Sequence, residues 1–245
     1  MQNVMNRQGN TYTIIYSVIL VLVVGIGLSV VYQILRPRQI ENIADDTRRQ
    51  ILAAALLTPK EGESISELYS DHITASFIVN DKGEVTDTIT NFDDADVKEE
   101  VKKPDSERRL PVFVCKTDAG LKYIVPVYGA GLWGPIWGYI AFDGNGDTIY
   151  GAYFAHQGET PGLGAEIEKP AFQDQFRNKN IFGANGDFES VKVVKNGHEP
   201  KDGEAYVHAI SGGTITSQGV QKMLENSLKP YSAYFKSLEG KEDNK

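Results

Sequence analysis

The chain has 245 residues, of which 41% are apolar and 24% are charged, and its formal net charge is −8. This composition is ordinary for a folded protein and suffices for a sizeable core in one domain. The acidic balance, without a basic stretch interleaved with aromatic residues, argues against a nucleic-acid partner. Cys115 is the only cysteine, which excludes an internal disulfide framework and a cysteine-ligated metal centre built from this chain alone. We expect it to be an inert core residue.

The N-terminal segment predicts a membrane anchor. No charged residue occurs from 8 to 35, and a helix over 12–35 would span a hydrocarbon core of about 30 Å. The apolar run is longer than that of a typical signal peptide, and no small-x-small cleavage site follows it, so a retained anchor is favoured over a cleaved signal. We therefore predict a tail over 1–11 and one transmembrane helix over 12–35.

The orientation of this anchor does not follow from its flanking charges. Four arginines follow the span and only Arg7 precedes it, so the charge bias alone would place the folded domain on the cytoplasmic side. The four are Arg36, Arg38, Arg48 and Arg49.

The rest of the chain predicts an α+β fold. Apolar residues at helical spacing over 39–57 indicate an amphipathic helix in a connecting segment, 36–60. In the domain 61–238, short β-branched and aromatic runs separated by turn signals predict a largely antiparallel sheet with flanking helices. The expected strands are 75–79, 111–116, 121–127, 136–142, 148–156, 190–194 and 206–210, and the expected helices are 169–179 and 218–228. The charge-rich stretch 93–109 is expected to be a solvated excursion, and 239–245 a flexible tail.

Several formal motifs fail in their context. The G-x-G-x-x-G match at 129–134 is followed by another strand pattern rather than a helix, which favours a glycine-rich turn over a dinucleotide site. The stretch 143–147 begins like a calcium loop, but Thr148 and Phe154 occupy the positions of its glycine and its glutamate, so a hairpin turn is predicted. The four histidines are scattered, and we expect neither a catalytic side chain nor a metal site.

Two other segments carry features of a ligand site. In 156–165, three glycines and a proline would let the backbone approach a planar ligand, with Glu159 and Thr160 offering an acceptor and a hydroxyl. The run 211–217 precedes a helical pattern, for which Ser217 or Thr216 is the expected N-cap. A glycine-rich turn at a helix N-terminus suits a phosphate group, although the residues alone slightly favour an ordinary capped helix start at this point.

The run 211–217, Ser-Gly-Gly-Thr-Ile-Thr-Ser, resembles the flavinylation motif D-x-x-S-G-A-T-x-T of covalent FMN-binding domains. With the Glu-Thr-Pro-Gly-Leu-Gly run at 159–164, the anchor and the tryptophan-containing segment 131–138, the whole chain is similar to the C subunit of the sodium-translocating NADH:quinone reductase (Nqr). The two motifs and the anchor are more specific together than any of them alone.

The resemblance implies that an FMN transferase joins the flavin phosphate to the hydroxyl of Thr214 as a phosphoester. The chain would then relay electrons, without binding NADH itself, in a bacterial inner-membrane complex that oxidises NADH, reduces ubiquinone and exports sodium. Its FMN domain would lie on the periplasmic side, with the other Nqr subunits and membrane lipid as partners. The residues expected to bind FMN are Thr214, Ser211, Gly212, Gly213, Thr216, Glu159, Thr160, Leu163, Gly164 and Trp133.

Two residues depart from the motif. His208 stands where the motif has aspartate, and it cannot supply a fixed negative charge for recognition by the transferase; Gly213 stands where the motif has alanine. Two other functions stay open: the G subunit of the ferredoxin:NAD oxidoreductase Rnf, which shares both motifs, and a non-redox anchored binding module. The segment 131–138 and the extra sequence between the anchor and the FMN loops favour Nqr.

Overall fold

The computed structural model describes residues 10–195, 197–200 and 203–239. Helix α1 (Asn10–Ala54) contains the whole predicted span and continues through Pro37 without a break. By length and composition it can cross a membrane. The predicted tail lies outside the described residues except for Asn10 and Thr11, which are already helical. One compact unit ends at Asp46 and the next begins at Thr47.

The end of α1 belongs to the folded unit. Ile51, Leu52 and Ala54 are fully buried, so the last turns of the helix take part in the core. The helix stops before the predicted end at residue 57, because Leu56 adopts a left-handed backbone with φ of 60° and Leu57 N–H bonds the carbonyl of Leu52. That part of the sequence prediction was wrong by three residues.

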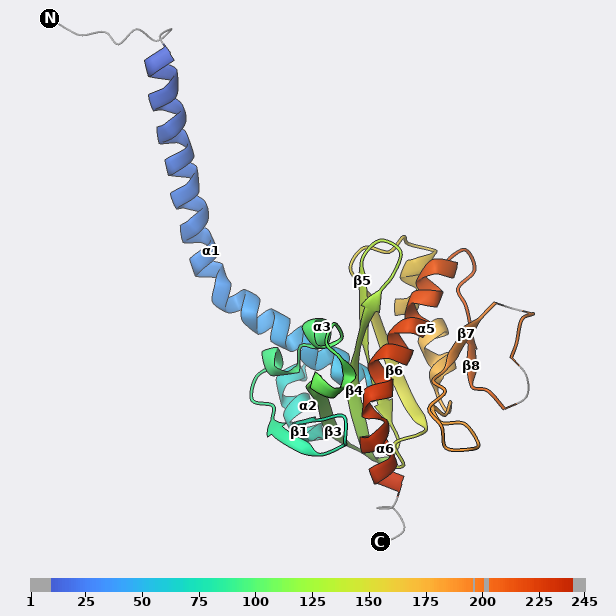
Figure 1. Cartoon of the computed structure of the whole chain (residues 1–245). Helices are drawn as coiled ribbons and strands as arrows, with labels where there is room; N and C mark the ends of the chain where they lie inside the picture. Colours follow the sequence, from blue (N-terminus) through green and yellow to red (C-terminus); the bar gives the residue numbers. More distant parts are fainter. Residues whose placement is uncertain (1–9, 196, 201–202, 240–245) are drawn as a thin grey trace, which may run out of the picture. The chain divides into compact units, whose positions relative to one another are not determined.

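Six antiparallel strands form the main sheet in the order β2-β1-β3-β4-β5-β6 (Figure 1). Five of them were predicted; β2 was not, because it is a four-residue edge strand whose side chains are all exposed. A second, parallel pair consists of β7 and β8, which are shorter than the predicted strands over 190–194 and 206–210. The strand bounds are β1 (Ile73–Val79), β2 (Val85–Thr88), β3 (Leu110–Thr117), β4 (Gly120–Ala130), β5 (Pro135–Phe142), β6 (Ile149–His156), β7 (Lys192–Val194) and β8 (Tyr206–His208).

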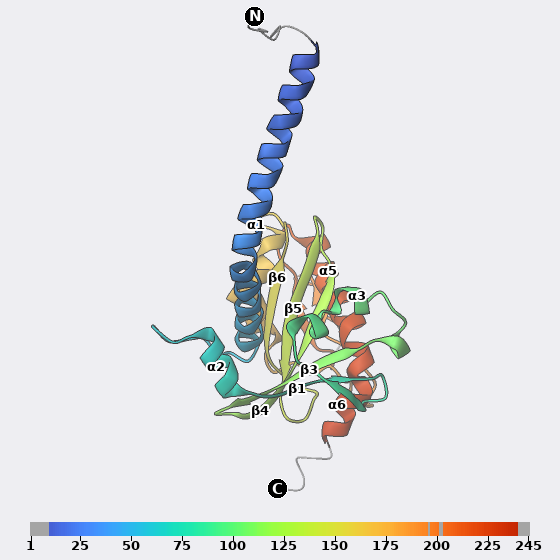
Figure 2. The same cartoon turned by 90° about the vertical axis from the view of Figure 1, so that its left-hand side faces the viewer.

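Alternating side chains of the sheet supply two separate cores. Val112, Val125 and Ile140 point to the larger core, which also receives the apolar residues of α5 (Thr214–Leu228) and α6 (Ser232–Glu239). Figure 2 shows these two helices along one side of the sheet. Their neighbours in the strands, such as Phe113 and Ala141, point to the other core, where they meet the end of α1. The α+β class with a largely antiparallel sheet is therefore confirmed.

The remaining helices are short. The predicted helix over 169–179 consists of α4 followed directly by η4, and it ends at Phe176, because the chain leaves helical geometry at Arg177 and Asn178 takes a φ of 61°. Helices α2 and α6 were not predicted. The bounds are α2 (Ile65–His72), η1 (Phe92–Ala95), α3 (Val97–Glu100), η2 (Asp105–Glu107), η3 (Gly164–Glu168), α4 (Pro170–Gln173), η4 (Asp174–Phe176) and η5 (Lys229–Tyr231).

The charge-rich stretch 93–109 is less solvated than expected. The Arg108 side chain is only 11% exposed, and its guanidinium donates to the carbonyls of Lys103, Val101 and Asn226 at 2.8–2.9 Å. The Asn226 carbonyl belongs to α5, so the long Arg108 side chain ties the excursion to the body of the domain. The sequence did not indicate this contact of Arg108, because nothing in the sequence distinguishes an arginine that bonds a distant carbonyl from an ordinary surface arginine.

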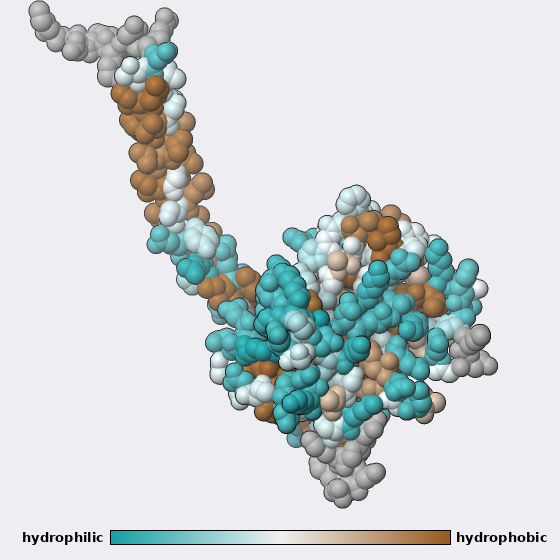
Figure 3. Space-filling model, in the orientation of Figure 1, coloured by the Kyte–Doolittle hydropathy of each residue, from teal (hydrophilic) through white to brown (hydrophobic). Residues whose placement is uncertain are grey.

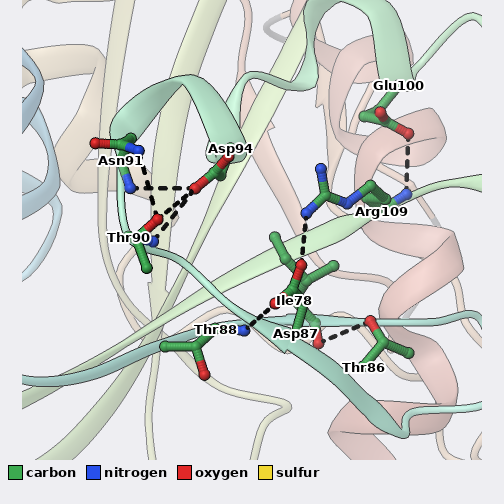
Figure 4. A network of polar contacts seen from close by, with 9 residues as sticks. All are labelled: Ile78, Thr86, Asp87, Thr88, Thr90, Asn91, Asp94, Glu100 and Arg109. Carbon is green, nitrogen blue, oxygen red and sulfur yellow. Dashed lines mark hydrogen bonds and ion pairs between the residues drawn. The ribbon is translucent and has the colours of Figure 1, made fainter.

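Asp94 holds the turn at the start of this stretch. Its Oδ2 accepts hydrogen bonds from Asn91 N, Thr90 N and Thr90 Oγ1 at 3.1–3.3 Å (Figure 4). These bonds, with that from the Asn91 backbone largest, lower the pKa of Asp94 below its ordinary value of 3.8. Because the folded pKa is the lower one, the stabilisation is present above pH 3.8 and is lost as the pH falls through the folded value.

We therefore expect Asp94→Asn to lower the melting temperature at pH 6 and to do so less and less below pH 3.8. Thermal unfolding of the two proteins across this range measures the difference. A deficit that stays constant with pH would contradict a role for the ionised carboxylate.

Helix α5 lies very close to the sheet at two glycines. A Cβ on Gly219 would meet the carbonyl oxygen of Ala130, and one on Gly129 would lie 2.7 Å from the Cβ of Met223. These glycines allow the first and middle turns of α5 to lie against the end of β4. The start of the helix is thus placed beside the loop that joins β4 to β5.

Candidate functional site

Helix α5 begins at Thr214, one turn earlier than predicted. Gly213 is its N-cap residue, and the carbonyl of Gly213 accepts the Ser217 N–H at 2.9 Å. The Ser217 hydroxyl instead accepts from the N–H of Ile210 at 3.0 Å, which holds the preceding chain against the first turn. The expectation that Ser217 or Thr216 is the N-cap was wrong, because both hydroxyls bond partners outside the helix.

The Glu159 carboxylate joins three segments of the chain. Its Oε1 accepts the N–H of Trp133 at 2.8 Å, and its Oε2 accepts the hydroxyl of Thr216 at 2.5 Å. Glu159 is 4% exposed and Thr216 is 1% exposed. The loop between β4 and β5, the loop after β6 and the first turn of α5 are therefore bound together by one buried side chain.

Glycines make room for this carboxylate. A Cβ on Gly131 would lie 2.5 Å from Glu159 Oε1, and one on Gly164 would meet Glu159 Oε2 and the Thr216 hydroxyl. Gly212, with a φ of +75°, brings its Cα next to the side chain of Leu163. The two motifs 159–164 and 211–217, well separated in sequence, are therefore in direct contact.

Apolar side chains stand exposed on these same segments. Trp133 is 68% exposed, Ile215 55%, Leu132 47% and Leu163 41%. Figure 3 shows an apolar patch at the end of the domain where Figure 1 has the β4–β5 loop and the start of α5. Thr214, between them, is half-buried. Glycine-lined backbone, exposed apolar side chains and a helix N-terminus fit a planar ligand that carries a phosphate.

The predicted binding residues differ in burial. Four are buried, namely Glu159, Gly164, Gly213 and Thr216, and Thr214 is half-buried. The other five lie at the surface: Trp133, Thr160, Leu163, Ser211 and Gly212. The sequence analysis did not single out Ile210, and it named Ser217 and the segment that begins at Gly131 without the contacts that they make here. Gly131 could have been found as the first residue of a glycine-rich turn, whereas the Ile210–Ser217 bond has no signal in the sequence.

His208 lies in β8, where its backbone N–H donates to Gln175 Oε1 at 2.8 Å and its ring packs edge-on against Tyr206. Its Nδ1 atom is buried and has no hydrogen-bond partner in the part of the chain that the structure describes. His208 thus lies on the strand that leads into the 211–217 turn.

The rejected motifs are turns, as predicted. Residues 131–134 connect β4 to β5, and in 143–147 the side chain of Asn145 accepts the N–H groups of Asp147 and Thr148. Cys115 is fully buried in β3, which confirms that it is a core residue. Burial raises the pKa of its thiol to about 11, which disfavours the reactive thiolate. Within the described ranges, no group of three or more acidic, histidine or cysteine side chains could hold a metal ion.

Residues 131–229, which contain all three segments of the site, match the family model of the FMN-binding domain. The fold and the site therefore define an FMN-binding protein. Among curated proteins, the chain is 32% identical over 228 residues to the C subunit of the Na(+)-translocating NADH-quinone reductase of Vibrio campbellii, covering 81% of this chain and 85% of that protein. It is 29% identical over 239 residues to the corresponding protein of Pseudomonas aeruginosa, covering 89% and 91%. The chain belongs to the NqrC family, the C subunits of the Na(+)-translocating NADH-quinone reductase.

Solved structures agree. The structure of the same reductase component from Parabacteroides distasonis is 45% identical with a TM-score of 0.74, over 82% of this chain and 96% of that one. The NqrC structure from Shewanella oneidensis is 28% identical with a TM-score of 0.67, over 80% and 98%. The resemblance to NqrC that the sequence motifs carry is thus confirmed.

Proposed function

We propose that this chain carries FMN as a phosphoester on Thr214 and relays electrons in a membrane complex that oxidises NADH, reduces quinone and exports sodium. The observation that carries the proposal is the position of Thr214, which is half-buried, is the first residue of α5 and directly follows the Gly212–Gly213 turn that lies against Leu163. Thr216, the other threonine of the motif, is buried with its hydroxyl bonded to Glu159, so of the two threonines Thr214 is the one whose hydroxyl is suited to attachment.

The first turn of α5 supports a phosphate at this position. The N–H groups of Thr214, Ile215 and Thr216 lie before the first intrahelical bond, which is donated by Ser217. Together with the positive end of the helix dipole, these N–H groups stabilise a negative charge next to the Thr214 oxygen.

The remaining residues hold and shield the ring. Leu163, Trp133, Leu132 and Ile215 provide apolar surface for the isoalloxazine, while Thr160 and Ser211 offer hydroxyls at its edge. Glu159 and Thr216 are buried below these side chains, and their hydrogen bonds hold the loops that carry them. Bound FMN would supply the electron-transfer chemistry, so the protein's own task is to position the flavin and set its potential. We assign no catalytic side chain and no NADH site to this chain.

The mass of the tryptic peptide containing Thr214, from protein made in a host that has an FMN transferase, tests the attachment. We expect the peptide mass to exceed the sequence mass by one FMN less one water. An unmodified peptide from a host that flavinylates other targets would refute the attachment. Flavin fluorescence that survives denaturing electrophoresis gives a second readout.

The anchor and the partners form the second part of the proposal. We propose that α1 is a single-pass anchor in a bacterial inner membrane with the FMN domain on the periplasmic side, although the flanking arginines favour the opposite side. The other Nqr subunits, the FMN transferase and lipid are the proposed partners. A phosphatase fused after Lys245 should be active, and co-purification should recover the other subunits. An inactive phosphatase beside an active cytoplasmic reporter would reverse the orientation.

A further inference from the structure

His156, the last residue of β6, holds the loop that follows it through its ring. The ring Nδ1 lies 3.1 Å from the backbone nitrogen of Glu159, and the side chain is 15% exposed. A backbone N–H can only donate, so Nδ1 must accept and the proton of the neutral ring must reside on Nε2. The contact therefore fixes the tautomer of His156.

Glu168 holds the other side of this histidine. One carboxylate oxygen, Oε1, accepts the backbone N–H of His156 at 3.1 Å and lies 3.7 Å from Nε2. The protonated Nε2 thus faces an acceptor, while the lone pair of Nδ1 faces the N–H of Glu159. Both ring nitrogens are matched to their neighbours in the one tautomer that the Glu159 contact requires.

The backbone of Glu159 is the point from which its buried carboxylate reaches two other segments. A small rotation of that backbone would move Oε1 and Oε2 away from the N–H of Trp133 and the hydroxyl of Thr216, which they bond at 2.8 and 2.5 Å. The carboxylate occupies its present position only because Gly131 and Gly164 have no Cβ, since a single added carbon at either position would collide with it.

We propose that His156 is a positioning residue of the flavin site: by accepting the Glu159 N–H, its Nδ1 sets the buried carboxylate that aligns the Trp133 loop with the Thr214 turn. The effect of His156 on the flavin rests on the proposed function of Thr214. The effect of His156 on the position of Glu159 is independent of that function.

Two amide substitutions distinguish the role of Nδ1 from that of Nε2. In His156→Asn the amide oxygen can take the place of Nδ1 as acceptor for the Glu159 N–H. In His156→Gln the amide group reaches instead toward the position of Nε2, beside Glu168. Asparagine and glutamine are both polar and of similar size. If the ring only filled space, the two variants would therefore behave alike.

The full chain in detergent, with its flavin, is compared with both variants by amide hydrogen exchange and by redox titration. We expect peptides covering 157–165 to exchange about fivefold faster in His156→Gln and at the wild-type rate in His156→Asn. The flavin midpoint potential should shift in the glutamine variant alone. Far-UV circular dichroism verifies that both variants are folded.

Equal behaviour of the two variants, whether both match the wild type or both exchange faster, would overturn the proposal. A difference in exchange without any shift in potential would limit His156 to setting Glu159 and overturn its effect on the flavin. If the wild type carries no covalent flavin, the proposed function fails, and the exchange comparison still decides the role of His156.

Discussion

Thr214→Val is expected to abolish covalent flavin attachment while leaving the domain folded. Valine keeps the shape of threonine but lacks the hydroxyl that forms the phosphoester. Thr214 is half-buried at the first position of α5, so the change should alter the free energy of unfolding by no more than about 1 kcal/mol. Intact mass and in-gel flavin fluorescence give the extent of attachment, and thermal unfolding gives the stability.

Thr216→Val is the matched control, because it makes the same change two residues away in the same helical turn. The Thr216 hydroxyl is buried and donates to Glu159 Oε2, so its loss leaves a carboxylate oxygen unpaired and should cost about 1–3 kcal/mol. The Thr214 hydroxyl is still present in this variant, so attachment should persist, at a lower extent because one bond that holds the turn is lost. The two variants should thus show opposite results: one folds normally without flavin, and the other is destabilised but flavinylated.

Thr214→Ser completes the comparison. Serine retains the hydroxyl and should retain at least partial attachment if the transferase needs only an oxygen at this position. A Thr214→Val protein that still carries covalent FMN would move the attachment point to another hydroxyl, of which Ser211 is the nearest exposed one in the motif.

The sequence predicted those parts of the structure that depend on local pattern. Runs rich in β-branched and aromatic residues, bounded by turn signals, placed β3 to β6 to within three residues at either end, because these strands contribute side chains to the two cores. Strand β2 was missed because its exposed Val-Thr-Asp-Thr run has no buried face. The helix 169–179 was mispredicted because helical spacing over a short window cannot reveal the left-handed turn at Asn178.

The candidate site also has a part that the sequence predicted and a part that it could not predict. The motifs identified Thr214, Leu163 and Glu159 as members of one site, and the contact of Leu163 with Gly212 is consistent with that assignment. The sequence could not show that Glu159 acts from beneath the surface rather than at it, because burial depends on the fold around Gly131 and Gly164. Nor could it place the helix start at Thr214, since capping propensity favoured hydroxyls that tertiary contacts use elsewhere.

Gly164→Ala is expected to have the largest effect on stability of any single-atom change in the site. The added methyl carbon would occupy the space of Glu159 Oε2 and the Thr216 hydroxyl, which form the short bond between the two motifs. The loop cannot relax outward without also losing the Glu159 bond to the Trp133 N–H. Overpacking together with the loss of a buried charged hydrogen bond should cost about 2–4 kcal/mol.

Gly158→Ala supplies the control within the same loop. A Cβ on Gly158 meets no atom within 4 Å, so alanine there should leave the melting temperature within about 2 °C of the wild type. Gly164→Ala should lower it by roughly 5–10 °C and should also reduce the extent of flavinylation, because the turn that presents Thr214 is no longer held in place. Equal melting temperatures for the two variants would mean that the loop tolerates a displaced carboxylate. Glu159 would then be a local contact rather than the residue that aligns the three segments of the site.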